Sequence, residues 1–98
     1  MENTYYNKLA HRLIELIGER HYFNGTAEIE TEEFCGILTA TLIIYRNPLF
    51  DPADISGTAT HITDIIPVWW KFDTYGPGGP CPNDFSWSEF HPFLIAAL

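Results

Sequence analysis

The chain has 98 residues, a hydrophobic fraction of 46% and a net charge of −8 at pH 7. This length suits one domain with one modest core, so we expect a single domain over residues 1–98. Thirteen acidic residues against five basic ones disfavour direct binding to nucleic acid or to an anionic membrane, because both are negatively charged. The apolar content also excludes an intrinsically disordered chain.

An amphipathic helix is predicted over residues 4–17. Tyr5, Leu9 and Leu13 recur at helical spacing and begin an apolar stripe, which is typical of a helix with one buried face. Gly18 follows the stripe, and glycine is common just after the last residue of a helix. We therefore expect the helix to end at Gly18, with an extension by one turn through Glu19-Arg20 as the alternative.

Two strands are predicted next. From Phe23 to Thr31 apolar and polar residues alternate, which indicates a strand with one buried and one wet face. The segment from about Phe34 to Arg46 is apolar or threonine on both faces, as expected of a central strand. Because proline cannot continue a central strand, Asn47-Pro48 should end it, and residues 47–57 are predicted to form a loop.

A third β segment is predicted over about Thr58–Tyr75. Pro67 interrupts it and indicates a bulge, a bend or an edge position. The sequence leaves open whether this segment is one bent strand or two. Because side chains alternate along a strand, we expect Val68, Trp70 and Phe72 on one face and Trp69, Lys71 and Asp73 on the other.

The end of the chain is predicted to be a connector followed by a short helix. Residues 76–83 are rich in glycine and proline and should have little regular structure. Ser86 and Glu89 have the spacing of a capping box, and Pro92 should break or restart the helix that follows. The apolar segment Phe93–Leu98 should be buried against the sheet or in another subunit.

These elements together predict an α+β fold in the order α-β-β-β-α. Three consecutive strands with short connections are most simply an antiparallel meander. We expect an antiparallel sheet of three to four strands packed by the N-terminal helix. The C-terminal segment should dock as a short helix or an irregular strap.

The residues form no coherent catalytic set, so we expect a non-enzymatic interaction or accessory module that needs no cofactor. One alternative is a small metal-dependent hydrolase, because histidine and carboxylates are suitable ligands for a metal ion. A regular strand would place residues three apart on opposite faces, which weakens this alternative. The metal site of this hydrolase would use His61, Asp64, Glu28 and Glu30. A second alternative is an acidic inhibitor of a basic partner.

A protein partner or a second copy of the chain is the expected ligand. Adjacent residues of a strand face opposite ways, so one residue of the Trp69-Trp70 pair should join the core and the other should be available outside. A homodimer would form by edge-strand pairing or by exchange of the apolar tail. The predicted contact residues are Trp69, Trp70, Phe93, Leu94 and Ile95.

The two cysteines, Cys35 and Cys81, are expected to be free thiols in a reducing compartment, whereas an oxidising one would allow a disulfide between them. The first residues lack a basic and then apolar segment, so no signal peptide is recognised and a reducing compartment is expected. The apolar runs are much shorter than the roughly 20 residues of a membrane helix. The sequence therefore predicts a cytoplasmic protein that does not enter the membrane.

Overall fold

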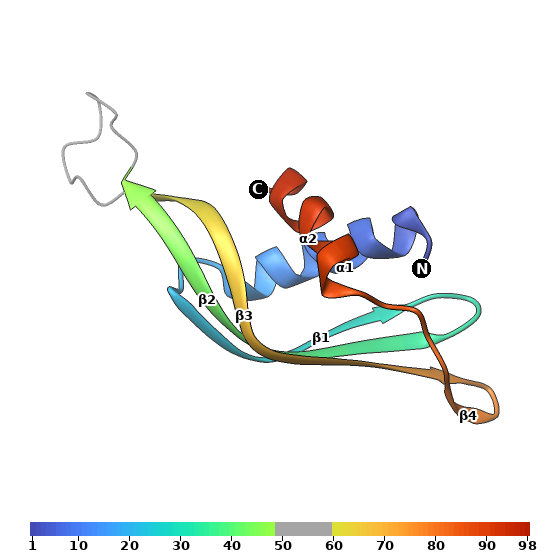
Figure 1. The fold of residues 1–98 in the computed structure, drawn as a ribbon. Helices are drawn as coiled ribbons and strands as arrows, with labels where there is room; N and C mark the ends of the chain where they lie inside the picture. The colour runs from blue at the N-terminus through green and yellow to red at the C-terminus, as the bar shows by residue number, and fades with distance from the viewer. Residues whose placement is uncertain (49–59) are drawn as a thin grey trace.

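The computed structural model describes residues 1–48 and 60–98. It confirms the α+β class, with the order helix, antiparallel sheet, short helix (Figure 1). Within the described residues the sheet has four strands in the order β1-β2-β3-β4, the upper end of the predicted range. The elements are α1 (Asn3–Ile17), β1 (Tyr22–Glu30), β2 (Cys35–Pro48), β3 (Thr60–Gly76), β4 (Gly79–Cys81) and α2 (Trp87–Ala96).

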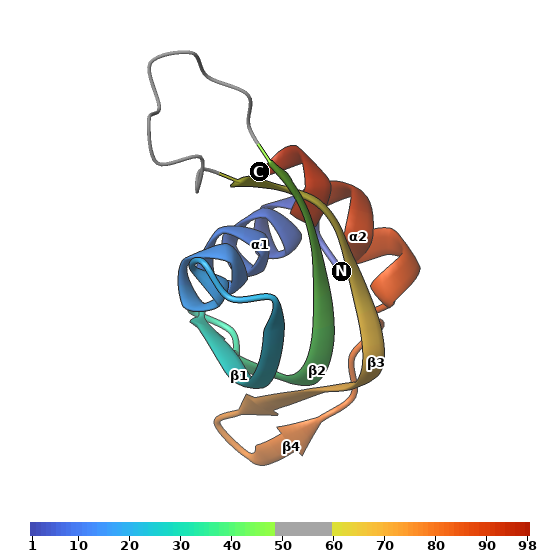
Figure 2. The ribbon, with the colours of Figure 1, turned by 90° about the vertical axis from the view of Figure 1, so that its left-hand side faces the viewer.

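Both helices pack on one face of the sheet, and the strands curve around them (Figures 1 and 2). The core lies between the helices and this inner face. Its side chains come from alternate positions of the strands, because only every second residue of a strand points to the same side. From the sheet these are Phe23, Ala27, Ile29, Leu38, Ala40, Leu42, Ile44, Ile65 and Phe72.

Helix α1 ends where the sequence predicts. Leu9, Leu13 and Ile17 have no exposed area, and Gly18 leaves the helix with a φ of 56°, a conformation that glycine adopts without strain. The guanidinium of Arg46 on β2 donates hydrogen bonds to the carbonyl oxygens of Gly18, at 2.5 Å, and Arg20, at 3.0 Å. A positive charge is favourable at the C-terminal end of a helix, and these hydrogen bonds link that end of α1 to β2 through Arg46.

Strand β3 is one continuous strand whose pairing with β2 is irregular at two places, next to Pro67 and at Thr63. Leu42 pairs with Pro67 and Thr41 with Trp69, so Val68 is an extra residue in a β-bulge. The prediction that Val68 shares a face with Trp70 and Phe72 is therefore wrong, and its side chain is 63% exposed. After the bulge, side chains again alternate between the two faces, and Trp70 and Phe72 pack on the helix side of the sheet.

The capping box predicted at the start of α2 is replaced by a contact with α1. Ser86 occupies the N-cap position but its hydroxyl does not cap the helix. Instead, the backbone N–H of Ser86 donates to the hydroxyl of Tyr6, which donates to a carboxylate oxygen of Glu89, each at 3.2 Å. The Tyr6 hydroxyl thus lies between the two groups that a capping box would join directly.

Helix α2 continues through Pro92, where a break was predicted. Proline removes one hydrogen bond of a helix, but Phe90 and Leu94 on either side of Pro92 are buried in the core and have no exposed area. Phe93 stacks on Tyr6 of α1, with ring centroids 5.4 Å apart. The apolar tail is therefore held largely by the N-terminal helix.

Two predictions fall partly on residues that the structure does not describe. The predicted loop at 47–57 lies outside the described residues from 49 onward, and so does the start of the third β segment at Thr58. Within residues 1–48 and 60–98, no helix is long and apolar enough to cross a membrane.

Candidate functional site

A cluster of exposed apolar side chains lies on the outer face of the sheet, opposite the helices. Tyr22 on β1, Ile43 on β2 and Ile66 on β3 are direct cross-strand neighbours and form a row across three strands. The bulge adds Val68 beside this row. We call the following residues the apolar patch: Tyr22, Ile43, Tyr45, Ile66, Val68 and Trp69.

The aromatic members of the patch are about half exposed. Tyr22 is 55% exposed, Tyr45 is 52% exposed and Trp69 is 51% exposed. Buried tyrosine and tryptophan usually gain a polar partner at one end while their rings cover apolar area. Exposed rings of this kind gathered on one face are typical of a surface that contacts another molecule.

Sequence reasoning found Trp69 but missed the rest of the patch. The second strand was predicted to be a central strand with apolar residues or threonine on both faces, and this did not show that Ile43 would be 38% exposed. The polar face of β1 could have shown which face of β2 is exposed. Asn24 and Thr26 on that face are cross-strand neighbours of Thr41 and Thr39 on β2. A wet face on β1 must continue onto the same face of β2.

The five predicted interface residues lie on different sides of the molecule. Trp69 is in the apolar patch, whereas Trp70 faces the helices, with its ring 5.2 Å from that of Phe85. Leu94 is fully buried. Phe93 and Ile95 are partly buried on α2. The structure therefore brings only Trp69 to the outer face.

The four residues of the alternative metal site are not brought together. Glu28 lies in register with Ile37, and Asp64 lies in register with Tyr45. Ile37 and Tyr45 are eight positions apart on β2, which is roughly 26 Å along a strand. Among the described residues, no three His, Cys, Asp or Glu side chains are grouped closely enough to hold a metal ion. His61 and Glu30 also lie at opposite ends of β2 in this register.

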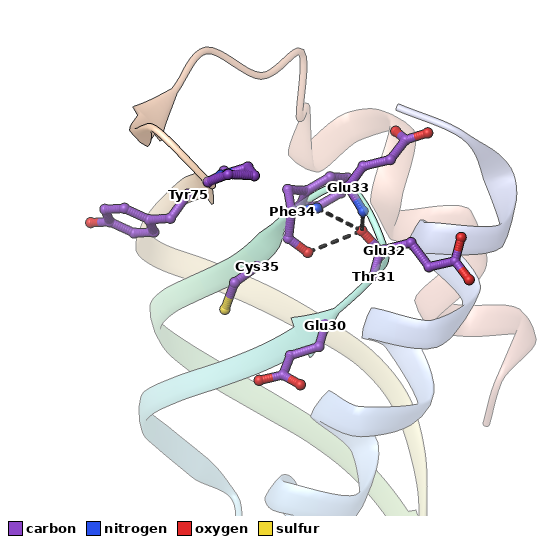
Figure 3. A pocket seen from close by; sticks show the side chains of 9 residues that line it. Glu30, Thr31, Glu32, Glu33, Phe34, Cys35 and Tyr75 are labelled. Carbon is purple, nitrogen blue, oxygen red and sulfur yellow. Dashed lines mark hydrogen bonds between the residues drawn. The ribbon is translucent and has the colours of Figure 1, made fainter.

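An acidic hollow of about 220 Å³ lies where β1 turns into β2. Thr31 organises this turn, because its hydroxyl accepts hydrogen bonds from the backbone N–H groups of Glu33 and Phe34. Figure 3 shows the carboxylates of Glu30, Glu32 and Glu33 pointing in different directions. They give the rim of the hollow a negative charge without converging on a common point.

A larger hollow of about 470 Å³ lies between the C-terminal parts of α1 and α2 and the end of the β2–β3 pair at Arg46 and Ile62. Ile14, Ile62 and Leu98 make its lining largely apolar. Arg46 also lines it, but its guanidinium is already bound to two carbonyl oxygens at the end of α1. Among the described residues, the hollow therefore offers apolar volume and His61, but no set of polar groups arranged for a specific ligand.

Asp64 pairs with a histidine that the sequence did not single out as its partner. His91 Nε2 on α2 lies 2.9 Å from Asp64 Oδ1, and the backbone N–H of Ile65 donates to the same oxygen at 2.8 Å. The hydrogen bond from His91, aided by the one from Ile65, lowers the pKa of Asp64 below its ordinary value of 3.8, although partial burial acts in the opposite direction. This pair joins the edge of the sheet to α2.

Acid should weaken this link. Because the pKa of Asp64 is lower in the folded chain, its contribution is present above pH 3.8 and is lost as the pH falls through the folded pKa. At neutral pH we expect Asp64→Asn to lower the free energy of unfolding by about 0–1 kcal/mol, since both side chains are partly exposed. Part of that difference should vanish below the folded pKa, as measured by urea unfolding at several pH values.

The matched control is Glu28→Gln, which removes an exposed carboxylate on the outer face of β1. Its effect should not follow the same pH profile. An Asp64→Asn effect that stayed constant from neutral to strongly acidic pH would contradict the assigned role of the His91 hydrogen bond.

Comparison with protein-family models, with curated proteins and with solved structures gave no match to this chain. The functional proposal therefore stands on the residues of this chain alone.

Proposed function

We propose that the chain is a non-enzymatic protein-interaction module and that the apolar patch is its contact surface. One observation carries the proposal: the patch gathers six large apolar side chains on one face of the sheet, each 38–63% exposed. Patches of this kind are uncommon on proteins that work alone, because contact with water is unfavourable for each side chain. Tryptophan and tyrosine, which form half of the patch, are also the residues that contribute most to protein interfaces.

An acidic inhibitor of a basic partner is the second candidate. It is favoured by the negative rim of the hollow at the β1–β2 turn, where Glu30, Glu32 and Glu33 follow one another closely. Such binding would weaken steeply with added salt, because salt screens attraction between exposed charges. A metal-dependent hydrolase has less support, since Glu28 and Asp64 lie far apart along the sheet.

A cytoplasmic location is part of the proposal. Cys35 and Cys81 are both free thiols. Their cross-strand partners, Tyr75 and Thr74, are adjacent residues of β3, so the two cysteines lie on opposite faces of the sheet. A disulfide between them would need a rearranged strand, which favours a compartment where thiols stay reduced.

Site-specific photocrosslinking tests the proposed contact surface. A photoreactive phenylalanine analogue would replace Tyr45, in the apolar patch, in cells that produce the chain. The matched control replaces Tyr75, an exposed tyrosine at the other end of β3, in register with Cys35. We expect a discrete adduct from position 45 and little from position 75. Equal yields at the two positions, or no adduct at either, would contradict the proposal.

A further inference from the structure

The central row of the apolar patch has no charged member, and charged residues of the outer face begin at Asp64, opposite Tyr45, and at Lys71, two residues after Trp69. This row of Tyr22, Ile43 and Ile66 is flanked by Asn24 and Thr41. Among the described residues, the nearest carboxylate in this register is that of Asp64, which His91 holds. Apart from Asp64, the charged residues of the outer face among those described lie toward the other end of the strands: Glu28, Glu30, Lys71 and Asp73.

The area of the patch matches a small protein interface. Aromatic side chains bury about 150–250 Å² each when they are covered. The exposed halves of Tyr22, Tyr45 and Trp69 therefore offer roughly 300 Å². The three aliphatic members and the neighbouring threonines add to this area. A standard interface buries about 800 Å² on each partner, whereas weak interfaces bury less than about 600 Å² on each, so the patch matches the smaller class.

We propose that the occupant of the apolar patch is a second copy of this chain, in an isologous dimer whose two outer faces meet. This inference rests on the proposed function and names the partner. An uncharged apolar surface complements itself, because it needs no opposite charge on the partner. A symmetric dimer also covers the same patch on both copies at once.

Charge selects one of two ways to stack the faces. A two-fold axis parallel to the strands would set the acidic ends of the two sheets against each other. An axis perpendicular to the strands places Glu28 and Asp73 of one copy at the opposite end from the same residues of the other. Because each chain carries a net charge of −8, only the second arrangement keeps the acidic ends apart. The curvature of the sheet around its helices (Figure 2) further limits the contact to the patch.

Salt should therefore strengthen this dimer. The apolar contact does not depend on salt screening, whereas the repulsion between two negative chains is reduced when the Debye length falls below about 8 Å. A basic partner bound to the acidic end would show the opposite response. The sign of the salt dependence thus distinguishes self-association through the patch from capture of a basic partner.

Sedimentation velocity on the purified full chain tests the proposal, at low and high sodium chloride and over concentrations that span the micromolar range. We expect a reversible monomer–dimer equilibrium with a dissociation constant on the order of micromolar. This constant should fall as salt rises. A chain that remains monomeric in high salt throughout that range would overturn the proposal.

Three variants locate the contact. Trp69→Ala should weaken dimerisation by about tenfold or more, whereas Tyr75→Ala, at the acidic end of the same face, should leave it unchanged. Ile43→Lys should abolish dimerisation, because it places a charge in the centre of the patch. The same substitution makes each chain less negative, so it would strengthen the dimer if overall charge were decisive. A dimer that persists in Ile43→Lys would overturn the proposal. Circular dichroism should show that all three variants fold, because the side chains are exposed.

The crosslinking experiment separates this inference from the proposed function. An adduct at position 45 with the mass of two chains supports both. An adduct with a different protein, together with a monomeric purified chain, would overturn the dimer and leave the interaction module standing. Absence of adducts at position 45 together with a monomeric chain would remove both.

Discussion

Replacing Phe90 by alanine is expected to lower the free energy of unfolding by about 3–5 kcal/mol. Phe90 has no exposed area. Its ring centroid lies 5.4 Å from that of Trp87 and 5.5 Å from that of Phe85. The ring of Tyr6 on α1 lies 5.9 Å away on another segment. Removing the Phe90 ring leaves a cavity in addition to the lost burial, because neighbours on α1 and at the start of α2 cannot both move inward to fill it. Urea unfolding followed by circular dichroism measures the loss.

Phe34→Ala is the control for Phe90→Ala. Phe34 is only partly buried and contacts Tyr5 through an edge-on arrangement with centroids 5.1 Å apart. Because Phe34 is less buried, its removal exposes less apolar area to water and leaves a cavity that water can enter. Phe34→Ala should therefore lower the free energy of unfolding clearly less than Phe90→Ala. If Phe90→Ala fails to fold, Phe90→Leu keeps most of the apolar volume and should remain measurable. Equal losses for Phe34→Ala and Phe90→Ala would contradict the central position of Phe90.

The sequence predicted the fold where periodicity was unambiguous. The alternation in β1 is compatible only with a strand, and the apolar stripe of α1 only with a helix. Both elements begin and end within a residue or two of the predicted bounds. Strand β4 was not predicted, because Gly79–Cys81 is a three-residue strand within a run of turn-forming residues. It exists only because Thr74 and Tyr75 on β3 offer it partners, which local sequence cannot reveal.

The apolar patch shows a different limit. Strand β2 is apolar on both faces, and periodicity cannot tell which face the helices will cover. That choice depends on α2 returning to the same side as α1 (Figure 2). The prediction for the Trp pair did not need this information, because two adjacent residues must face opposite ways whichever side is covered. The tail residues were expected to form an interface because they are apolar, whereas Leu94 and Phe93 are held within the chain itself.

Gly36→Ala is expected to destabilise the fold by about 1–3 kcal/mol, because the added methyl group overpacks the core. A Cβ atom at Gly36 would lie 2.7 Å from Cζ of Phe72, 3.2 Å from Cγ1 of Ile29 and 3.3 Å from Cε2 of Phe34. Phe72 cannot simply move away, since its ring stacks on Phe85 with centroids 4.5 Å apart. The change in the urea midpoint at constant slope measures this loss.

The control for Gly36→Ala is Gly78→Ala, because a Cβ atom at Gly78 would meet nothing within 4 Å. Its effect should stay within about 0.5 kcal/mol. The clash also predicts a specific coupling. Phe72→Leu shortens the side chain that the new methyl group would meet, so Gly36→Ala should cost less in the Phe72→Leu background than in the original chain. Two results would contradict this explanation: additive effects of Gly36→Ala and Phe72→Leu, or equal effects of Gly36→Ala and Gly78→Ala. Either would show that the packing of Phe72 over Gly36 is not the reason for glycine at position 36.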